Sequence, residues 1–61
     1  MADYICYRIN GRIYRFEHVV MDGGIPYGYC ARLRKHAWLY PTCVVFEGKG
    51  GGTAQMAELC P

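Results

Sequence analysis

The dipeptide Asn10-Gly11 lies between two runs of β-branched and aromatic residues and constrains the fold of this chain more than any other feature. Such a pair favours a two-residue hairpin turn. A type I′ turn needs positive φ at both central positions, and asparagine followed by glycine adopts these angles at little cost. The sequence therefore predicts a β-hairpin over residues 4–20.

A two-residue turn also fixes the register of this hairpin. The predicted pairs are Ile9 with Arg12, Arg8 with Ile13, Tyr7 with Tyr14, Cys6 with Arg15, Ile5 with Phe16 and Tyr4 with Glu17. Because side chains alternate between the two faces of a strand, one face is mostly apolar and should point toward the core. This face carries Ile5, Tyr7, Ile9, Tyr14, Phe16, His18 and Val20. A slip by one residue would turn the whole set outward.

The length of 61 residues indicates one small domain. A domain of this size buries only about 60% of its unfolded surface, so it usually needs disulfides, a metal or oligomerisation. The chain contains six tyrosines and is 52% hydrophobic, which is more than a small sheet can cover, so we expect a homodimer or higher homo-oligomer. The net charge of +2 does not by itself indicate nucleic acid. No apolar run approaches the ~20 residues of a membrane span.

The cysteine pattern argues against a metal site. Cys6, Cys30, Cys43 and Cys60 form no Cys-x-x-Cys pair, and neither histidine stands at zinc-ligand spacing from them. Three disulfide pairings are possible for four cysteines. The chain opens with Met-Ala-Asp and no apolar signal segment follows, so we expect a cytoplasmic protein with reduced thiols. A signal peptide replaced by a cloning methionine would reverse this expectation.

The segment after the hairpin contains strong turn signals. Residues 21–28 are expected to form a loop, because Asp22-Gly23-Gly24 has turn chemistry and Pro26 holds the residue before it in an extended conformation.

Residues 29–40 allow two interpretations. As a helix, they present an apolar stripe at positions i, i+3, i+7 and i+10, ended by Pro41 and made of Cys30, Leu33, Ala37 and Tyr40. As a strand, they alternate up to about Lys35, with Tyr29, Ala31 and Leu33 on one face and Cys30, Arg32 and Arg34 on the other. We favour the helix, because alanine, leucine, arginine and lysine are good helix formers.

The rest of the chain is interpreted as a strand, a loop and a short helix. Residues 42–47 are almost continuously β-branched or apolar, which is typical of a strand covered on both faces. A glycine-rich loop follows at 48–52, and Thr53 is a suitable N-cap for a helix over 53–60. The predicted fold class is α+β: a small, three-stranded, mainly antiparallel sheet built on the N-terminal hairpin, with one helix after the hairpin and a short C-terminal helix.

The glycine-rich loop is the first candidate site. A strand, a glycine-rich loop and a helix N-terminus together aim backbone amides at a phosphate. Lys49 can add a counter-charge and Thr53 a hydroxyl, although the lysine precedes the glycines and so departs from the P-loop pattern. The alternative is a flexible connector that lets the tail fold back.

A basic cluster interleaved with aromatic residues is the second candidate site. It contains Arg32, Arg34, Lys35 and His36, followed by Trp38 and Tyr40. Such residues can hold a phosphate backbone and stack a base, and the alternative is a solvated outer face. Arg8 and Arg15 share one face of the hairpin and would extend the cluster, while Tyr27, Tyr29 and Tyr40 are candidates for exposed contacts.

We therefore expect a small non-enzymatic protein that binds an anionic, phosphate-bearing ligand, either a nucleotide or single-stranded nucleic acid. The expected ligand-binding residues are Arg8, Arg15, Arg32, Arg34, Lys35, Trp38, Tyr40, Lys49, Gly50, Gly51, Gly52 and Thr53. Catalysis is not expected, because Glu17 and His18 are adjacent on a strand and point to opposite faces. No cofactor or metal is expected either.

A protein-binding inhibitor module is the alternative function. It would occlude a partner protein through a face rich in tyrosine, tryptophan and arginine, or through an edge strand, as small phage-encoded proteins often do.

Overall fold

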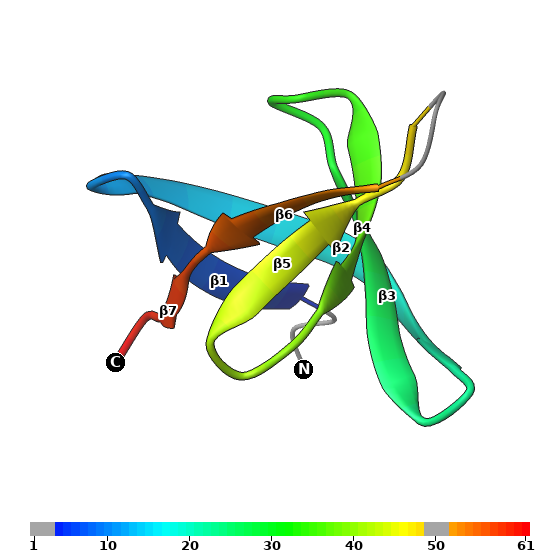
Figure 1. Cartoon of the computed structure of the whole chain (residues 1–61). Helices are drawn as coiled ribbons and strands as arrows, with labels where there is room; N and C mark the ends of the chain where they lie inside the picture. Colours follow the sequence, from blue (N-terminus) through cyan, green and yellow to red (C-terminus); the bar gives the residue numbers. More distant parts are fainter. Residues whose placement is uncertain (1–3, 49–51) are drawn as a thin grey trace.

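The computed structural model describes residues 4–48 and 52–61, and these residues form an all-β protein (Figure 1). The strands are β1 (Tyr4–Ile9), β2 (Arg12–Asp22), β3 (Ile25–Cys30), β4 (Lys35–Leu39), β5 (Cys43–Phe46), β6 (Thr53–Met56) and β7 (Glu58–Leu59). They form one seven-stranded antiparallel sheet in the order β6-β5-β4-β3-β2-β1-β7. Nowhere in the described segments is there a helix long and apolar enough to cross a membrane.

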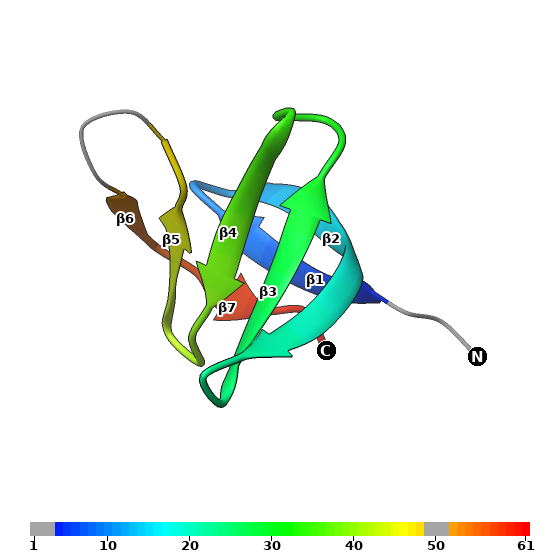
Figure 2. The same ribbon diagram turned by 90° about the vertical axis from the view of Figure 1, so that its right-hand side faces the viewer.

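The sheet curls into a nearly closed barrel because its two outermost strands are consecutive in the chain (Figures 1 and 2). β6 pairs with β5, and β7 pairs with β1, so one C-terminal segment bridges both edges. Ala57 lies between the two strands, is only 6% exposed, and donates its backbone N–H to the Thr42 carbonyl at 3.0 Å. The bend at Ala57 therefore brings the first and last parts of the sheet together.

The N-terminal hairpin is confirmed with its predicted register. All six pairs from Tyr4–Glu17 to Ile9–Arg12 are present. Asn10 has a φ of 53° and Gly11 a φ of 76°, as a type I′ turn requires. The side chains of Tyr7, Ile9 and Phe16 point inward from this hairpin and are buried.

The predicted inward placement of His18 and Val20 is wrong because β2 contains a bulge. The register with β3 shifts between Glu17 and Val20, and His18 has a φ of 54°. This extra residue reverses the alternation, so Val19 packs against the core while Val20 is 58% exposed. The bulge bends β2, so this long strand can pair with both β1 and β3 in the curved sheet.

The predicted turn is confirmed at Gly23 and Gly24, but the rest of the predicted loop at 21–28 and the predicted helix at 29–40 are wrong. β2 continues to Asp22, only Gly23 and Gly24 form the turn, and residues 25–30 are β3. A turn at residues 31–34 then leads into β4, so the segment forms a second hairpin. Local helix propensity is weak, and here it is outweighed by antiparallel pairing along β2, β3, β4 and β5.

The predicted C-terminal helix at 53–60 is also wrong, and with it the three-stranded α+β fold. Thr53 begins β6 as a strand residue instead of capping a helix. A short helix would have left the outer edges of β1 and β5 without backbone partners. As strands, the same residues form backbone hydrogen bonds with both β5 and β1. This pairing outweighs the local sequence pattern that favoured a helix.

The core fills the barrel with side chains from β1 to β5 and from Ala57, which lies between β6 and β7. It consists of Tyr7, Ile9, Phe16, Cys30, Ala37, Leu39, Val44, Phe46 and Ala57. Phe16 is completely buried and contacts Tyr7 edge-on at 5.9 Å between ring centroids and Phe46 at 6.1 Å. Such edge and tilted contacts are the preferred arrangements of packed aromatic rings.

Gly28 provides a test of this packing, because a Cβ at this position would lie 3.2 Å from the Cβ of Phe16 and 3.2 Å from the Cγ2 of Val19. We expect Gly28→Ala to lower the free energy of unfolding by about 1–3 kcal/mol through overpacking, measured by urea denaturation. Gly48→Ala is the matched control, since its Cβ would meet nothing within 4 Å. Equal stability of the two variants would contradict the close packing of Phe16 and Val19 around Gly28.

Candidate functional site

The outer faces of β3 and β4 carry a row of four aromatic side chains, which we call the aromatic face. Tyr27 pairs with Trp38, and Tyr29 pairs with His36, so all four point away from the core on one side of the sheet. Figure 2 views the barrel with these two strands toward the reader. His36 is exposed and the other three are half-buried, so the rings remain partly accessible.

The four rings form one continuous row of contacts, in the order Tyr29, His36, Tyr27 and Trp38. The ring centroids of Tyr29 and His36 lie 4.7 Å apart, and those of His36 and Tyr27 lie 5.1 Å apart with nearly parallel planes. Tyr27 and Trp38 continue the row, with ring centroids 5.1 Å apart and planes tilted by 48°. Aromatic groups at these separations stabilise one another, so the face is ordered before any ligand arrives.

Two carboxylates hold the polar tips of Tyr27 and Trp38. The Tyr27 hydroxyl donates a hydrogen bond to Glu47 Oε1 at 2.6 Å, and Trp38 Nε1 donates one to Asp22 Oδ2 at 2.8 Å. Asp22 ends β2 and Glu47 follows β5, so the two acids flank the aromatic face from opposite sides. Within residues 4–48 and 52–61, neither acid forms an ion pair.

The Glu47 contact changes the titration of Tyr27. The hydrogen bond to Glu47, assisted by some burial and by the negative charges of Glu47 and Asp22, raises the pKa of Tyr27 to about 12 from its ordinary value of 10.0. Ionised tyrosine could not donate this hydrogen bond and would be repelled by both acids. Tyr27 is therefore a neutral donor throughout the physiological range.

The basic residues predicted to bind a ligand are spread over several surfaces. Arg8 pairs with Glu58 at 3.4 Å and Arg15 with Glu17 at 3.1 Å, both on the outer surface of the hairpin. Arg32 lies over the Tyr14 ring and donates to the Ile13 carbonyl, which anchors the β3–β4 turn on β2. These three arginines thus have local structural contacts.

The predicted aromatic, glycine and threonine residues do not converge either. Trp38 belongs to the aromatic face, whereas Tyr40 lines a hollow together with Leu39 and Pro41. Arg34 precedes β4 and Tyr40 follows it, so the two residues lie at opposite ends of this strand. Gly52 has a packing role, because a Cβ there would lie 2.7 Å from Val45 Cγ1. Thr53 begins β6, and the predicted positions Lys49, Gly50 and Gly51 lie outside the described residues.

One end of the barrel does gather positive charge. Arg32 and Arg34 lie in the β3–β4 turn, Lys35 begins β4, and Arg12 follows the β1–β2 turn. Both turns border one hollow, which is lined by Asn10, Leu33 and Lys35 among others. We call these four cations the basic end. In the described part of the chain none of them forms an ion pair.

The sequence alone did not indicate that Glu47 and His36 contact Tyr27 or that Asp22 contacts Trp38. A signal for the aromatic face was present: Tyr27 and Tyr29 stand at i and i+2, as do His36 and Trp38, on either side of residues 31–34. This symmetric spacing is typical of a hairpin. The two acids carried no such local signal, because each comes from a neighbouring strand.

We searched the described residues for a metal site, and we compared the chain with known proteins, to identify a function. Across the described ranges, no three side chains of histidine, cysteine, aspartate or glutamate gather as metal ligands would. Comparison with protein families, curated proteins and solved structures finds no match to this chain. The function is therefore inferred from the geometry of the aromatic face and the basic end.

The raised pKa of Tyr27 predicts a pH dependence of stability. An unfolded tyrosine loses its proton near pH 10, whereas folded Tyr27 keeps its proton up to about pH 12. The contribution of this hydrogen bond to stability is therefore complete below pH 10 and disappears as the pH rises through about 12. We expect denaturant titrations to show the wild type losing more stability than Tyr27→Phe across this range. Parallel losses in the two proteins would contradict the assignment.

Proposed function

We propose that this chain is a small protein-binding module whose aromatic face holds a cationic segment of a partner protein. The observation that carries the proposal is the row of four contacting rings with an acid on each side. Neither acid has a cationic partner among the described residues. Aromatic faces attract guanidinium and ammonium groups, and nearby carboxylates strengthen this attraction.

The two acids favour arginine in particular. Each carboxylate uses one oxygen to accept from Tyr27 or Trp38, and its other oxygen can accept from a ligand. A guanidinium is planar, so it can stack on a ring while its N–H groups donate to a carboxylate. Asp22 and Glu47 lie on either side of the rings, so two basic side chains can be held at once.

The aromatic face is also suited to binding because its rings are already fixed. Hydrogen bonds hold Tyr27 and Trp38 in place, and ring contacts hold His36 between Tyr27 and Tyr29. A surface ordered in advance loses little conformational entropy when a partner docks. Tyrosine and tryptophan are, in addition, the residue types that contribute most to binding hot spots.

An anionic ligand is disfavoured on this face. Its phosphates would approach Asp22 and Glu47, and like charges repel. The predicted phosphate cradle also relied on a helix beginning at Thr53, where the structure has a strand. Inhibition of the partner, a homo-oligomeric state and a cytoplasmic location remain predictions from the sequence.

A labelled oligo-arginine peptide tests the proposal by fluorescence anisotropy. We expect the wild type to bind it, and the double variant Asp22→Asn/Glu47→Gln to bind about tenfold or more weakly, because the amides keep the acceptor oxygens but lose the charges. Trp38→Ala should weaken binding similarly through loss of the ring. Tyr4→Ala is the control, since Tyr4 is a 44% exposed tyrosine on β1, away from this face.

A second labelled peptide with citrulline in place of arginine separates charge from shape. Citrulline is nearly isosteric with arginine but neutral, so we expect its binding to be weak and insensitive to the Asp22→Asn/Glu47→Gln change. Equal affinity of the wild type for both peptides would refute cation recognition by the aromatic face.

Single-stranded nucleic acid is the second candidate ligand, and the observation that favours it is the basic end. A labelled oligonucleotide should bind there with an affinity that falls steeply with salt, because phosphate binding releases counterions. Arg34→Ala/Lys35→Ala should weaken binding and lower the salt slope by about 1 for each phosphate that is no longer neutralised. Trp38→Ala should have little effect, since its ring lies on the aromatic face. An oligonucleotide that does not bind at low salt would exclude this candidate.

A further inference from the structure

The seam between β1 and β7 places two cysteines opposite each other. The register pairs Arg8 with Glu58 and Tyr7 with Leu59, and the next pair in this register is Cys6 with Cys60. The Cys60 backbone N–H donates to the Cys6 carbonyl at 3.1 Å, so the antiparallel pairing does continue to this position. The two residues are therefore direct cross-strand neighbours.

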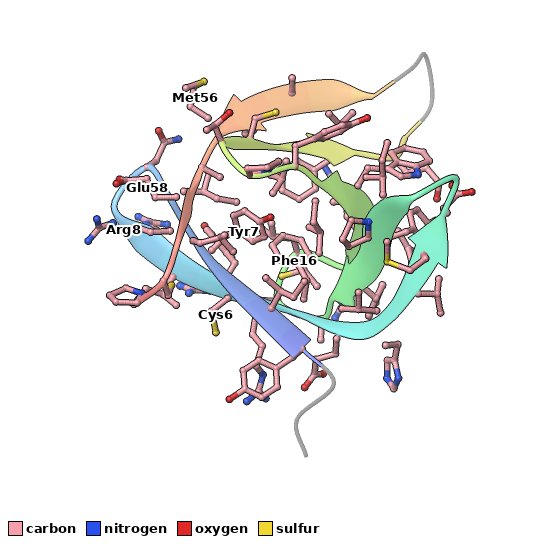
Figure 3. The ribbon with its side chains drawn as sticks, turned by 90° about the horizontal axis from the view of Figure 1, so that it is seen from below. Cys6, Tyr7, Arg8, Phe16, Met56 and Glu58 are labelled. Atoms are coloured by element: carbon pink, nitrogen blue, oxygen red, sulfur yellow. The ribbon has the colours of Figure 1, made fainter. Side chains whose placement is uncertain are left out.

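Both side chains belong to the outer face of the barrel. Arg8 and Glu58 form an ion pair on the outer surface, at 3.4 Å and with side chains 53% and 73% exposed. Cys6 precedes Arg8 by two positions and Cys60 follows Glu58 by two, so both cysteines lie on the face of that ion pair. Figure 3 shows Cys6 and Arg8 pointing away from the core residues Tyr7 and Phe16.

This arrangement fits a disulfide. Opposite residues in a hydrogen-bonded antiparallel pair have Cα atoms about 5.5 Å apart. Disulfides join residues whose Cα atoms are about 4.4–6.8 Å apart. Cys30 is buried inside the barrel and Cys43 lies opposite Met56, so neither faces another cysteine. Cys6 and Cys60 are both half-buried thiols and remain accessible.

We propose that Cys6 and Cys60 are a thiol–disulfide exchange site that reacts with an anionic low-molecular-weight disulfide and covalently joins the last strand to the first. A hollow of about 410 Å³ adjoins Cys6, and Arg15 and Arg32 are among the residues that line it. Glu17 also lines the hollow and pairs with Arg15 at 3.1 Å, so Arg32 leaves the hollow with a net positive charge. This charge can attract the carboxylates of a compound such as oxidised glutathione, which brings its sulfur–sulfur bond to Cys6. The proposal is independent of the aromatic face.

The exchange proceeds in two balanced steps. The thiolate of Cys6 attacks one sulfur of oxidised glutathione, the sulfur–sulfur bond breaks, and one glutathione leaves as its thiolate. The thiolate of Cys60 then attacks the Cys6 sulfur, which releases the second glutathione and forms the protein disulfide. The protein loses two protons and two electrons, and oxidised glutathione gains them as two thiols.

The disulfide would reinforce the weakest seam of the barrel. β7 pairs with β1 through only two residue pairs, whereas β2 pairs with β1 through six. A bond from Cys6 to Cys60 also closes a loop of nearly the whole chain, which restricts the unfolded state strongly. We therefore expect oxidation to raise the melting temperature by about 10 °C or more.

Peptide mapping of the full chain tests the site directly. The protein is treated with oxidised glutathione, its remaining thiols are alkylated, and it is digested with trypsin. The four cysteines fall on separate tryptic peptides, namely residues 1–8, 16–32, 36–49 and 50–61. We expect a linked peptide that joins 1–8 to 50–61, with Cys30 and Cys43 alkylated. Four alkylated cysteines, or any other linkage, would overturn the proposal.

Thermal melts with and without oxidised glutathione supply the second measurement. The rise in melting temperature should be present in the wild type and in Cys43→Ser, absent in Cys60→Ser, and reversed by dithiothreitol. Cys60→Ser removes only a half-buried thiol after the last strand, so this variant should still fold. A rise that persists in Cys60→Ser would place the reactive pair elsewhere and refute the assignment.

Discussion

The pairing of residues 53–59 with two different strands is the interaction on which the rest of this structure depends. Without it, β5 and β1 would be exposed edges, and the inner face of the sheet would open to water. A single bend at buried Ala57 lets the segment leave β5 and join β1. Because the barrel closes in this way, a chain of 61 residues encloses Phe16 and Val44 completely.

The same closure determines which side chains meet on the surface. The rings of the aromatic face belong to one hairpin, but Asp22 and Glu47 come from the strands on either side of it. Their contacts with Tyr27 and Trp38 exist only because β2, β3, β4 and β5 are neighbours in one sheet. Likewise, Cys6 and Cys60 stand near opposite ends of the sequence and face each other only across the seam. Both proposed sites are therefore products of the strand order.

The hairpin at residues 4–20 could be predicted because its information is local, whereas the site could not. Asn10 and Gly11 specify the turn, and the turn sets the register. Residues 29–40 have an apolar pattern that suits a helix as well as a strand, and intrinsic propensity favoured the helix. The decisive contacts are the pairs that β3 makes with β2 and that β4 makes with β5. Of the predicted ligand-binding residues, only Trp38 belongs to the aromatic face, and Arg32, Arg34 and Lys35 belong to the basic end.

The sequence by itself determined the first hairpin, its turn conformation, its register up to Glu17, and the strand that contains Val44. These features follow from backbone preferences and alternation within a few residues, which act before any distant part of the chain is in place. Only the tertiary structure decided the bulge at His18, the second hairpin, the extended tail and the meeting of the aromatic rings with their acids. Those features depend on backbone hydrogen bonds between strands that are distant in sequence, and a strand gains such bonds only once its neighbours are present.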